Sequence, residues 1–287
     1  MFKRKERQVS DDEAIRSLPH DRKGVFFDLL AHRKMTLFVL SSYTFVFFIP
    51  LAIDLFITNY FVFAAINADK PKDAFSLLFY FMLIMIPCMV IGFLGFAGAF
   101  QVAKKMVWQE GISISVDFFQ GIKENWKRAI INGLIFGVLL FGMVMGGSYL
   151  LVYSPFAPIW CGVGIGALIL VFMTFGMVIS LNFTQDVYYQ NPFIITFKNS
   201  FYFLALTNWK VLVIFLLSTG AVIALSILNL ITLGVGLFLF AILNSVVIIL
   251  YTLVSHSAFD KYINKEHYPD MVNKGLYKAE NKENKEA

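Results

Sequence analysis

The chain has 287 residues, of which 58% are hydrophobic and only 15% are charged, and its formal net charge is +5. Soluble proteins carry about 25% charged residues, so this composition excludes an ordinary water-soluble domain and indicates a membrane protein. The positive charge is spread over the connections between apolar runs, so no nucleic acid is expected among the partners.

Residues 1–34 precede the first apolar span and are mostly polar, with nine Lys and Arg residues. A secretory signal has a short basic region followed at once by a short apolar stretch, so this cytoplasmic segment is not expected to be one. Near its end, Val25, Phe26, Leu29 and Leu30 predict a short helix that lies in the membrane interface.

A helix that crosses the hydrocarbon core needs about 20 mainly apolar residues. Six stretches satisfy this requirement, and none of them contains Lys or Arg. The six are residues 35–58, 74–100, 129–153, 160–183, 211–231 and 234–255. We therefore predict an all-α fold, a polytopic bundle of six transmembrane helices in residues 35–256, and a cytoplasmic tail at 257–287 that is disordered at its end.

The connections between the spans alternate in charge. Residues 101–128 hold five Lys and Arg residues and the chain after His256 holds six, whereas the connections at 154–159 and 232–233 hold none. Because Lys and Arg favour the cytoplasmic side, this pattern predicts that both termini are cytoplasmic. The expected location is the cell (plasma) membrane, with the lipid bilayer as a partner.

Two cytoplasmic connections, residues 116–128 and 192–209, are predicted to form amphipathic interfacial helices. The tripeptide Asn-Trp-Lys occurs near the end of both, which leaves two interpretations open: an internal repeat, or independent helices with similar anchors. Trp108 is likewise expected in the headgroup zone. The candidate cytoplasmic contact surface consists of Phe119, Lys123, Trp126, Lys127, Phe197 and Trp209.

Glycines recur at the four-residue spacing that lets transmembrane helices approach closely. In the third and fourth predicted spans the pairs are Gly133 and Gly137, Gly142 and Gly146, and Gly162 and Gly166. The spacing predicts tight packing of these two spans, either within one chain or between two chains of a dimer.

Four polar residues in or near the spans are candidate functional residues: Asp54, Asn132, Asn182 and Asn244. Asp54 is the only ionisable residue clearly inside a predicted span, about one helical turn from its outer end. An intramembrane carboxylate is typical of proton or cation coupling, and near a helix end it also fits a boundary role. The amides, of which Asn244 lies deepest, are expected to hydrogen-bond between helices or to contact a solute.

The sequence contains no recognised motif for catalysis, metal binding or cofactor binding. The four histidines, at positions 20, 32, 256 and 267, lack the spacing of zinc ligands, and neither a phosphate-binding loop nor a Gly-x-Ser-x-Gly nucleophile turn is present. Cys88 and Cys161 fall in or beside apolar spans and are expected to be structural. We therefore expect no enzymatic activity, no metal and no cofactor.

The second span and the connection after it carry a longer pattern. It runs from Gly92-Phe-Leu-Gly95-Phe-Ala-Gly-Ala-Phe through Lys104-Lys105 and Glu110-Gly111 to Asp117-Phe-Phe-Gln-Gly-Ile-Lys-Glu-Asn-Trp-Lys-Arg-Ala129. This order of a small-residue span, a basic stretch and an aromatic segment resembles the YesL-like family of bacterial membrane proteins. The resemblance covers residues 92–136, and the long polar N-terminus departs from it.

The resemblance gives no catalytic residues to carry over, because none is defined in that family. Its members often accompany carbohydrate-uptake systems. The first expected function is therefore a non-enzymatic accessory or regulatory component of a membrane transport system. The alternative is a small-solute transporter or facilitator, acting as a monomer or dimer through groups such as Asn244 and Asp54.

Overall fold

Long helices make up most of the chain. The computed structural model describes residues 19–153, 158–189 and 191–276, and this part contains no strand. Five helices are long and apolar enough to cross a membrane, and a bent segment makes a sixth if it is counted as one span. The five are α3 (Lys34–Asn67), α4 (Pro71–Val107), α5 (Ile114–Tyr153), α6 (Pro158–Tyr188) and α9 (Leu230–Phe259). The predicted all-α, multi-pass fold is confirmed, with five to six spans.

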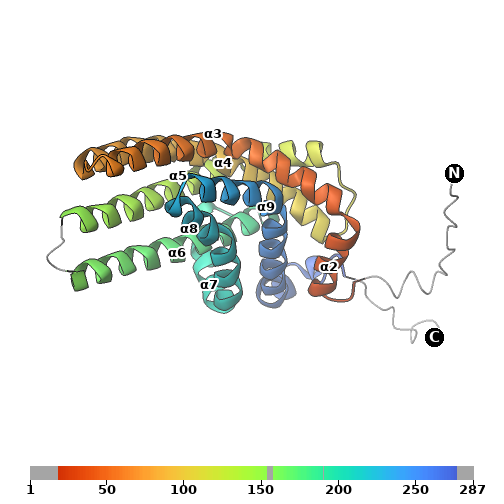
Figure 1. Cartoon of the computed structure of the whole chain (residues 1–287). Coiled ribbons are helices and arrows are strands. Elements are labelled where there is room, and N and C mark those ends of the chain that lie inside the picture. The colour runs from red at the N-terminus through yellow and green to blue at the C-terminus, as the bar shows by residue number, and fades with distance from the viewer. Residues whose placement is uncertain (1–18, 154–157, 190, 277–287) are drawn as a thin grey trace, which may run out of the picture.

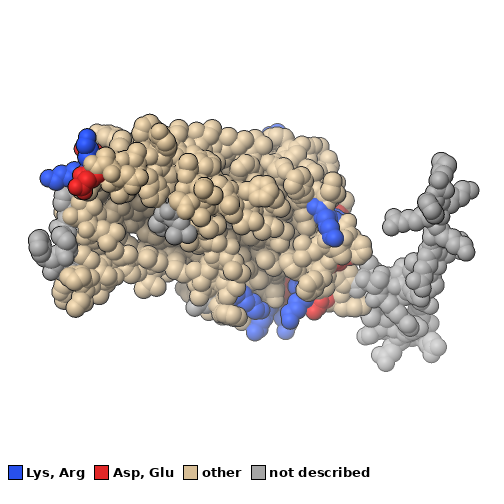
Figure 2. All heavy atoms as spheres, viewed as in Figure 1, with Lys and Arg blue, Asp and Glu red and all other residues tan. Residues whose placement is uncertain are grey.

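The first four long helices run side by side and reverse direction at each connection, so the bundle has two ends (Figure 1). One end, called here the Lys70 end, holds the connection between α3 and α4. The other, the α2 end, holds α2 and three short C-terminal helices. The elements at this end are α2 (Arg22–His32) and the C-terminal η2 (Asp260–Asn264), α10 (Lys265–His267) and η3 (Pro269–Met271). Figure 2 shows charged side chains toward both ends of the visible face and an uncharged band between them, as the apolar core of a bilayer requires.

The polar stretch at residues 101–128 is mostly helical, which corrects the expectation of a loop followed by a separate interfacial helix. α4 continues to Val107 and α5 begins at Ile114. Residues 116–128 are therefore the first turns of a 40-residue helix that runs on without interruption.

A buried carboxylate fixes the start of this long helix. Asp117 accepts a hydrogen bond from the Ser113 backbone N–H at 2.9 Å and forms an ion pair with Lys105 Nζ at 2.6 Å. The first contact satisfies an otherwise free N–H beside the first turn of α5, and the second ties that turn to α4. Because both partners come from the polar stretch, its charges support the helices instead of interrupting them.

α3 and α4 end in the same Schellman motif. The residue after each cap, Asp69 or Gln109, has a left-handed φ of 56° or 55°. In both motifs the following residue closes the turn: the Lys70 N–H donates to the Ala65 carbonyl, and the Glu110 N–H donates to the Lys105 carbonyl. This arrangement satisfies the last carbonyls and turns the chain back toward the bundle.

Glycines place α4 directly against both of its neighbours. A Cβ atom at Gly95 would lie 2.8 Å from Phe47 Cβ on α3, and one at Gly98 would lie 2.7 Å from the Phe118 carbonyl oxygen on α5. From the α5 side, a Cβ atom at Gly133 would lie 2.9 Å from the backbone of α4. Glycines on α4 and α5 therefore let α4 pack closely against both α3 and α5.

The predicted glycine packing between the third and fourth spans is present only in part, because a Cβ atom at Gly146 would lie 2.9 Å from Leu168 Cδ1 on α6. A Cβ atom at Gly142, Gly162 or Gly166 would meet no atom within 4 Å. Their spacing is typical of helix contacts, but in the described part of the chain these positions face open space.

This difference leads to a stability prediction. Gly98→Ala is expected to destabilise the protein by about 1–3 kcal/mol, because the added methyl group collides with backbone that cannot move aside without shifting α5. Gly142→Ala is the matched control, since it adds the same methyl group where no atom is near, and should leave stability unchanged. Thermal unfolding in mild detergent measures both, and equal midpoints for the two variants would contradict the prediction.

The predicted fifth span, residues 211–231, is not one regular helix. α7 (Phe193–Phe215) is followed by the π-helical segment η1 (Leu216–Gly220) and by α8 (Ala221–Leu228). The helix axis bends by 102° between Phe193–Thr207 and Trp209–Leu225. Regular α-helical geometry is thus lost twice, at this bend and again in η1.

The hairpin before the last span turns at Asn229, which corrects the predicted turn at residues 232–233. Asn229 has an extended backbone, with φ −170° and ψ 175°. Its side chain accepts a hydrogen bond from the Thr232 N–H at 2.9 Å, and the Thr232 hydroxyl accepts one from the Asn229 N–H at 3.1 Å. This capping box starts α9 at Leu230, so Thr232 lies inside the helix.

Candidate functional site

A large, mainly apolar cavity lies inside the bundle. Its volume is about 710 Å³, within the range of about 300–1,000 Å³ that is typical of small-molecule sites. Its walls come from α3, α4, α5, α6, η1, α8 and α9. The described residues that line it include no Asp, Glu, Lys, Arg or His. Such a cavity suits an uncharged molecule that is mostly hydrocarbon.

The cavity is present because α9 covers only part of α3. Leu233, in the first turn of α9, packs against Ala52. α3 continues from there to Asn67, about 22 Å farther along its axis. In Figure 1 the start of α9 accordingly lies well short of the Lys70 end. The long helices therefore project beyond the α8–α9 hairpin, and the space between them stays partly open.

Asn244, the deepest amide predicted from the sequence, lies in the wall of this cavity. Its Nδ2 donates to the carbonyl oxygens of Ser41 at 3.2 Å and Phe240 at 3.0 Å. Its Oδ1 is buried and has no hydrogen-bond partner. An unsatisfied amide oxygen in an apolar interior is costly, and protein atoms cover this one, so it does not itself face the cavity space.

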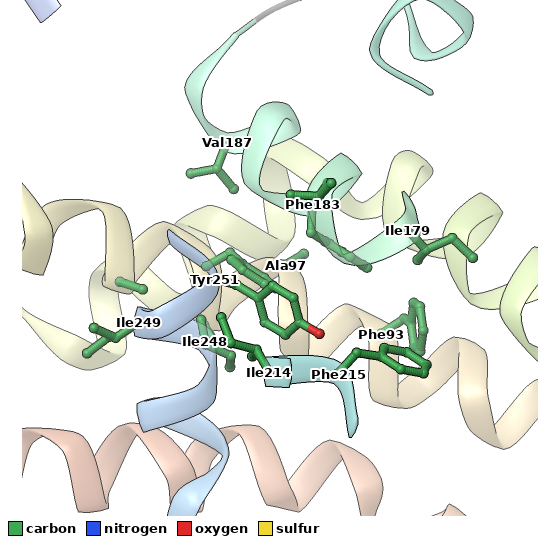
Figure 3. Close-up of a cluster of buried hydrophobic side chains, with 14 of the residues drawn as sticks. Phe93, Ala97, Ile179, Phe183, Val187, Ile214, Phe215, Ile248, Ile249 and Tyr251 are labelled. Atoms are coloured by element: carbon green, nitrogen blue, oxygen red, sulfur yellow. The ribbon is translucent and has the colours of Figure 1, made fainter. Parts of the chain in front are cut away.

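Tyr251, which the sequence analysis missed, adds a second polar group to the same wall. Its side chain is 4% exposed, and its hydroxyl lies beside those of Ser180 and Ser218. These two serines donate to backbone carbonyls in their own helices, so their oxygens remain free to accept a hydrogen bond from Tyr251. Figure 3 shows the ring next to Ile248, with the hydroxyl oxygen pointing toward the side of Phe93 and Phe215. A tyrosine deep in an apolar run was the only sequence signal for this site.

Asp54 lies elsewhere and does not line the cavity. α3 runs thirteen residues beyond it, about 20 Å, so the prediction that Asp54 lies one turn from the end of this helix is wrong. The side chain is buried, and its Oδ2 has no hydrogen-bond partner. The structure therefore places this carboxyl group in the interior of the bundle.

Asn132 and Asn182 meet between α5 and α6. The Asn182 Nδ2 donates to the Asn132 Oδ1 at 2.9 Å, and both side chains are fully buried. One turn away, Arg128 Nη1 forms an ion pair with Asp186 Oδ1 at 2.7 Å. These four residues form a polar ladder that joins the two helices, so neither asparagine lies in the cavity wall.

A second polar cluster, at the α2 end, was not expected from the sequence. Arg22 donates to Asp260 Oδ2 at 2.8 Å and to the Lys274 carbonyl oxygen at 2.8 Å. Lys274 Nζ pairs with Glu110 at 2.8 Å and lies 3.8 Å from the ring centre of Trp108. We call these five residues, with His256, the Arg22 cluster. Lys274, which belongs to the predicted tail at 257–287, is thus held against the bundle.

His256 is the buried centre of this cluster. The Trp108 indole N–H donates to His256 Nε2 at 2.7 Å. Because an indole nitrogen can only donate, Nε2 must be the unprotonated nitrogen, so the neutral ring carries its proton on Nδ1. Nδ1 then donates to Asp260 Oδ2 at 3.0 Å. The contacts leave His256 no free nitrogen, which indicates a structural role.

The cluster extends to the end of α6 through Tyr189. The Tyr189 hydroxyl donates to Asn264 Oδ1 at 2.6 Å, and Asn264 in turn donates to Asp260 Oδ1 at 2.8 Å. Burial raises the pKa of the Tyr189 phenol above its ordinary value, so this group stays a neutral donor at physiological pH. Segments from both ends of the sequence are therefore joined to α6.

The candidate contact surface remains outside the packed interior. Phe119 is 56% exposed, Trp126 46% and Trp209 71%, and Phe197 is half-buried. Lys123 and Lys127 are exposed on the same part of α5. Trp108 differs from the expectation for the headgroup zone, because it is buried in the Arg22 cluster.

Neither a metal site nor a known relative assigns a function to this chain. Over the described ranges, no three His, Cys, Asp or Glu side chains come together as metal ligands. Comparison of the chain with protein-family models, with curated proteins and with solved structures found no match. The resemblance to the YesL-like family thus stays a prediction.

Proposed function

We propose that this chain is a non-enzymatic integral membrane protein that binds a small lipophilic molecule inside its helical bundle. This is the transporter or facilitator alternative, with the solute specified as lipophilic. The cavity of about 710 Å³ carries the proposal, because a packed bundle leaves few voids larger than a water molecule. Its uncharged wall argues against coupling to an ion and favours movement of a neutral solute along its own gradient.

The orientation that fits this role has six spans and both termini in the cytoplasm of a cell membrane. The α2 end carries Arg22, Lys104, Lys105 and Arg128. At the Lys70 end, the connection between α3 and α4 combines two lysines with two aspartates. The excess of basic residues supports a cytoplasmic α2 end.

Filling the cavity tests the proposal. Leu140 is buried in the cavity wall, so Leu140→Trp should displace a bound molecule. Val138 lies on the same helix, is 56% exposed and does not line the cavity, so Val138→Trp is the matched control. Native mass spectrometry of protein extracted with its surrounding lipid should show a bound small molecule in the wild type and in Val138→Trp, and loss of it in Leu140→Trp.

Two results would overturn the proposal: no bound small molecule in the wild type, or equal retention in both tryptophan variants. Size-exclusion chromatography shows whether Leu140→Trp is folded. If it is not, Met143→Phe provides a smaller change in the same wall.

The accessory or regulatory role in a transport system is the second candidate function. The specific observation in its favour is the exposed combination of Phe119, Trp126, Lys123 and Lys127 at the start of α5. The same spectra distinguish the two candidates. A stoichiometric protein partner that leaves the cavity empty would favour the accessory role.

A further inference from the structure

We infer that the cavity takes up its molecule from the hydrocarbon of the bilayer, through a lateral portal between α3 and α5 in the leaflet at the Lys70 end. This inference rests on the proposed function and adds the route and the leaflet from which the molecule comes. Three observations carry it: the depth of the α8–α9 hairpin, the exposure of the wall residues beyond that hairpin, and the aromatic packing that closes the opposite end.

The α8–α9 hairpin covers only the part of the cavity nearer the α2 end. α9 contacts Ala52 on α3 through Leu233 and, farther along, contacts Ser41, so the two helices are antiparallel. The turn of the hairpin, at Asn229, therefore lies about 6 Å beyond Ala52 toward the Lys70 end. The cavity wall on α3 continues past this level to Ile66, about another 15 Å.

Past the turn of the hairpin, three helices form the wall. Phe61 on α3 stacks on Phe81 on α4, and Phe79 on α4 contacts Phe141 on α5, so these parts of the three helices lie at one level. α6 lines the cavity only within residues 176–183, so its outer half takes no part. The described wall residues at this level and beyond it include Val62, Ile66, Leu78, Val144, Ser148 and Leu151.

The side of this wall opposite α4 is open. The ring contacts between α3 and α5 lie toward the α2 end, where Tyr43 and Phe47 meet Phe118. Nearer the Lys70 end α4 separates the two helices, and no described residue of another helix lines the side that faces away from α4. Ile66 on α3 is 53% exposed, and Leu151 on α5 is 67% exposed. We call the opening between these two residues the lateral portal.

Phenylalanine rings close the opposite end of the cavity. Phe100 on α4 stacks on Phe183 on α6, with ring centres 5.6 Å apart and planes inclined by 6°. Phe96 contacts Phe48 on α3 at 4.8 Å and Phe240 on α9 at 6.4 Å. All five rings line the cavity, and Phe48, Phe100 and Phe183 are at most 5% exposed. A molecule therefore cannot enter from the α2 end without displacing this packed group.

The η1 and α9 side of the cavity is the competing route. Leu217, Leu239 and Leu243 are exposed residues of this part of the wall. Here, however, α8 and α9 are in close contact, because a Cβ atom at Gly236 would lie 3.2 Å from Leu225 Cβ. Entry between these helices requires α8 to move, whereas the lateral portal is already open.

The chemistry of the portal fits a molecule that comes from lipid. Of the six described wall residues beyond the hairpin, only Ser148 is polar and none is charged. The charged residues of this end lie in residues 69–73, past the end of α3. The portal therefore faces the hydrocarbon of the leaflet at the Lys70 end, and a molecule that uses it must first dissolve in that layer.

Blocking the portal should slow exchange of a bound molecule without removing it. The protein in nanodiscs is loaded with hexadecane and then mixed with perdeuterated hexadecane, and native mass spectrometry follows the replacement of one by the other. Ser148→Trp is expected to slow this replacement at least about tenfold. Occupancy at equilibrium should stay at the wild-type level, because a barrier on the route slows entry and exit equally.

Gly147→Trp is the matched control, because Gly147 is the preceding residue of α5, does not line the cavity, and has no atom within 4 Å of an added Cβ. Leu217→Trp tests the competing route at η1. Both variants should exchange hexadecane at the wild-type rate. If Ser148→Trp does not fold, as judged by size-exclusion chromatography, Leu151→Trp changes the portal at a more exposed position.

Four results would overturn the portal while leaving the proposed function in place. These are wild-type exchange in Ser148→Trp, equal slowing in Gly147→Trp, slowing in Leu217→Trp alone, and loss of hexadecane from Ser148→Trp, which would put Ser148 in the binding site itself. If the wild type binds no hexadecane, the proposed function fails.

Discussion

Replacing Arg128 with methionine is expected to destabilise the bundle by about 3–5 kcal/mol, the largest effect of any substitution proposed for this chain. The Asp186 side chain is 1% exposed, and Arg128 is the cation that neutralises it. Without the guanidinium, the carboxylate would remain buried without a partner or would have to take up a proton. Either outcome costs free energy in the folded state and none in the unfolded state.

The reverse substitution, Asp186→Asn, should cost clearly less. Arg128 is 23% exposed and also donates to the carbonyl oxygens of Tyr189 and Asn191, so its charge keeps partners and some water when Asp186 is neutral. The double variant Arg128→Met/Asp186→Leu should regain most of the loss, because it leaves no buried charge. Unfolding midpoints of the three variants in detergent measure this order, and equal losses for the two single variants would contradict it.

This ion pair also shows where sequence reasoning stopped. The apolar spans could be predicted because length and composition alone show that a helix can cross the hydrocarbon core of a bilayer. The charged residues of the connections were used only to predict orientation, whereas Lys104 donates to the Val187 carbonyl and Arg128 pairs with Asp186. Each partner is 58 or more residues away. No local sequence pattern predicts such distant pairs. The long helices, which continue past their apolar segments, were therefore predicted too short.

The repeated tripeptide Asn-Trp-Lys gives a second example. Its first copy, at residues 125–127, lies inside the uninterrupted helix α5. Its second copy, at residues 208–210, lies at the 102° bend of α7. The same three residues thus occur once inside a regular helix and once at a bend. Short local matches therefore could not decide between a repeat and independent helices.

The candidate site was predicted only in part, for a related reason. Asn244 was recognised because an amide deep in an apolar run must find a partner. The sequence could not show that only its Nδ2 does so. Tyr251 is one of several aromatic residues in apolar runs, and its place in the cavity wall depends on how distant helices pack. A cavity is the space that several helices fail to fill, so it has no residue pattern of its own.

Trp108→Phe is expected to destabilise the protein by about 1–3 kcal/mol, the second large effect. Phenylalanine keeps the aromatic ring on which Lys274 lies but removes the one donor that His256 Nε2 has among the described residues. Since His256 is fully buried, water cannot replace that donor without opening the Arg22 cluster. The ring can accept a second proton once Nε2 is free, which would place its charge beside Arg22.

Trp126→Phe is the matched control, because Trp126 is 46% exposed on α5 and donates no hydrogen bond within the described structure. Thermal unfolding should separate the two variants, with a lower midpoint for Trp108→Phe alone. Hydrogen exchange should localise the effect, with faster exchange in α2 and in residues 260–276, which the Arg22 cluster joins to the bundle. Unchanged exchange in these segments would show that His256 satisfies Nε2 in another way, and that the cluster does not depend on Trp108.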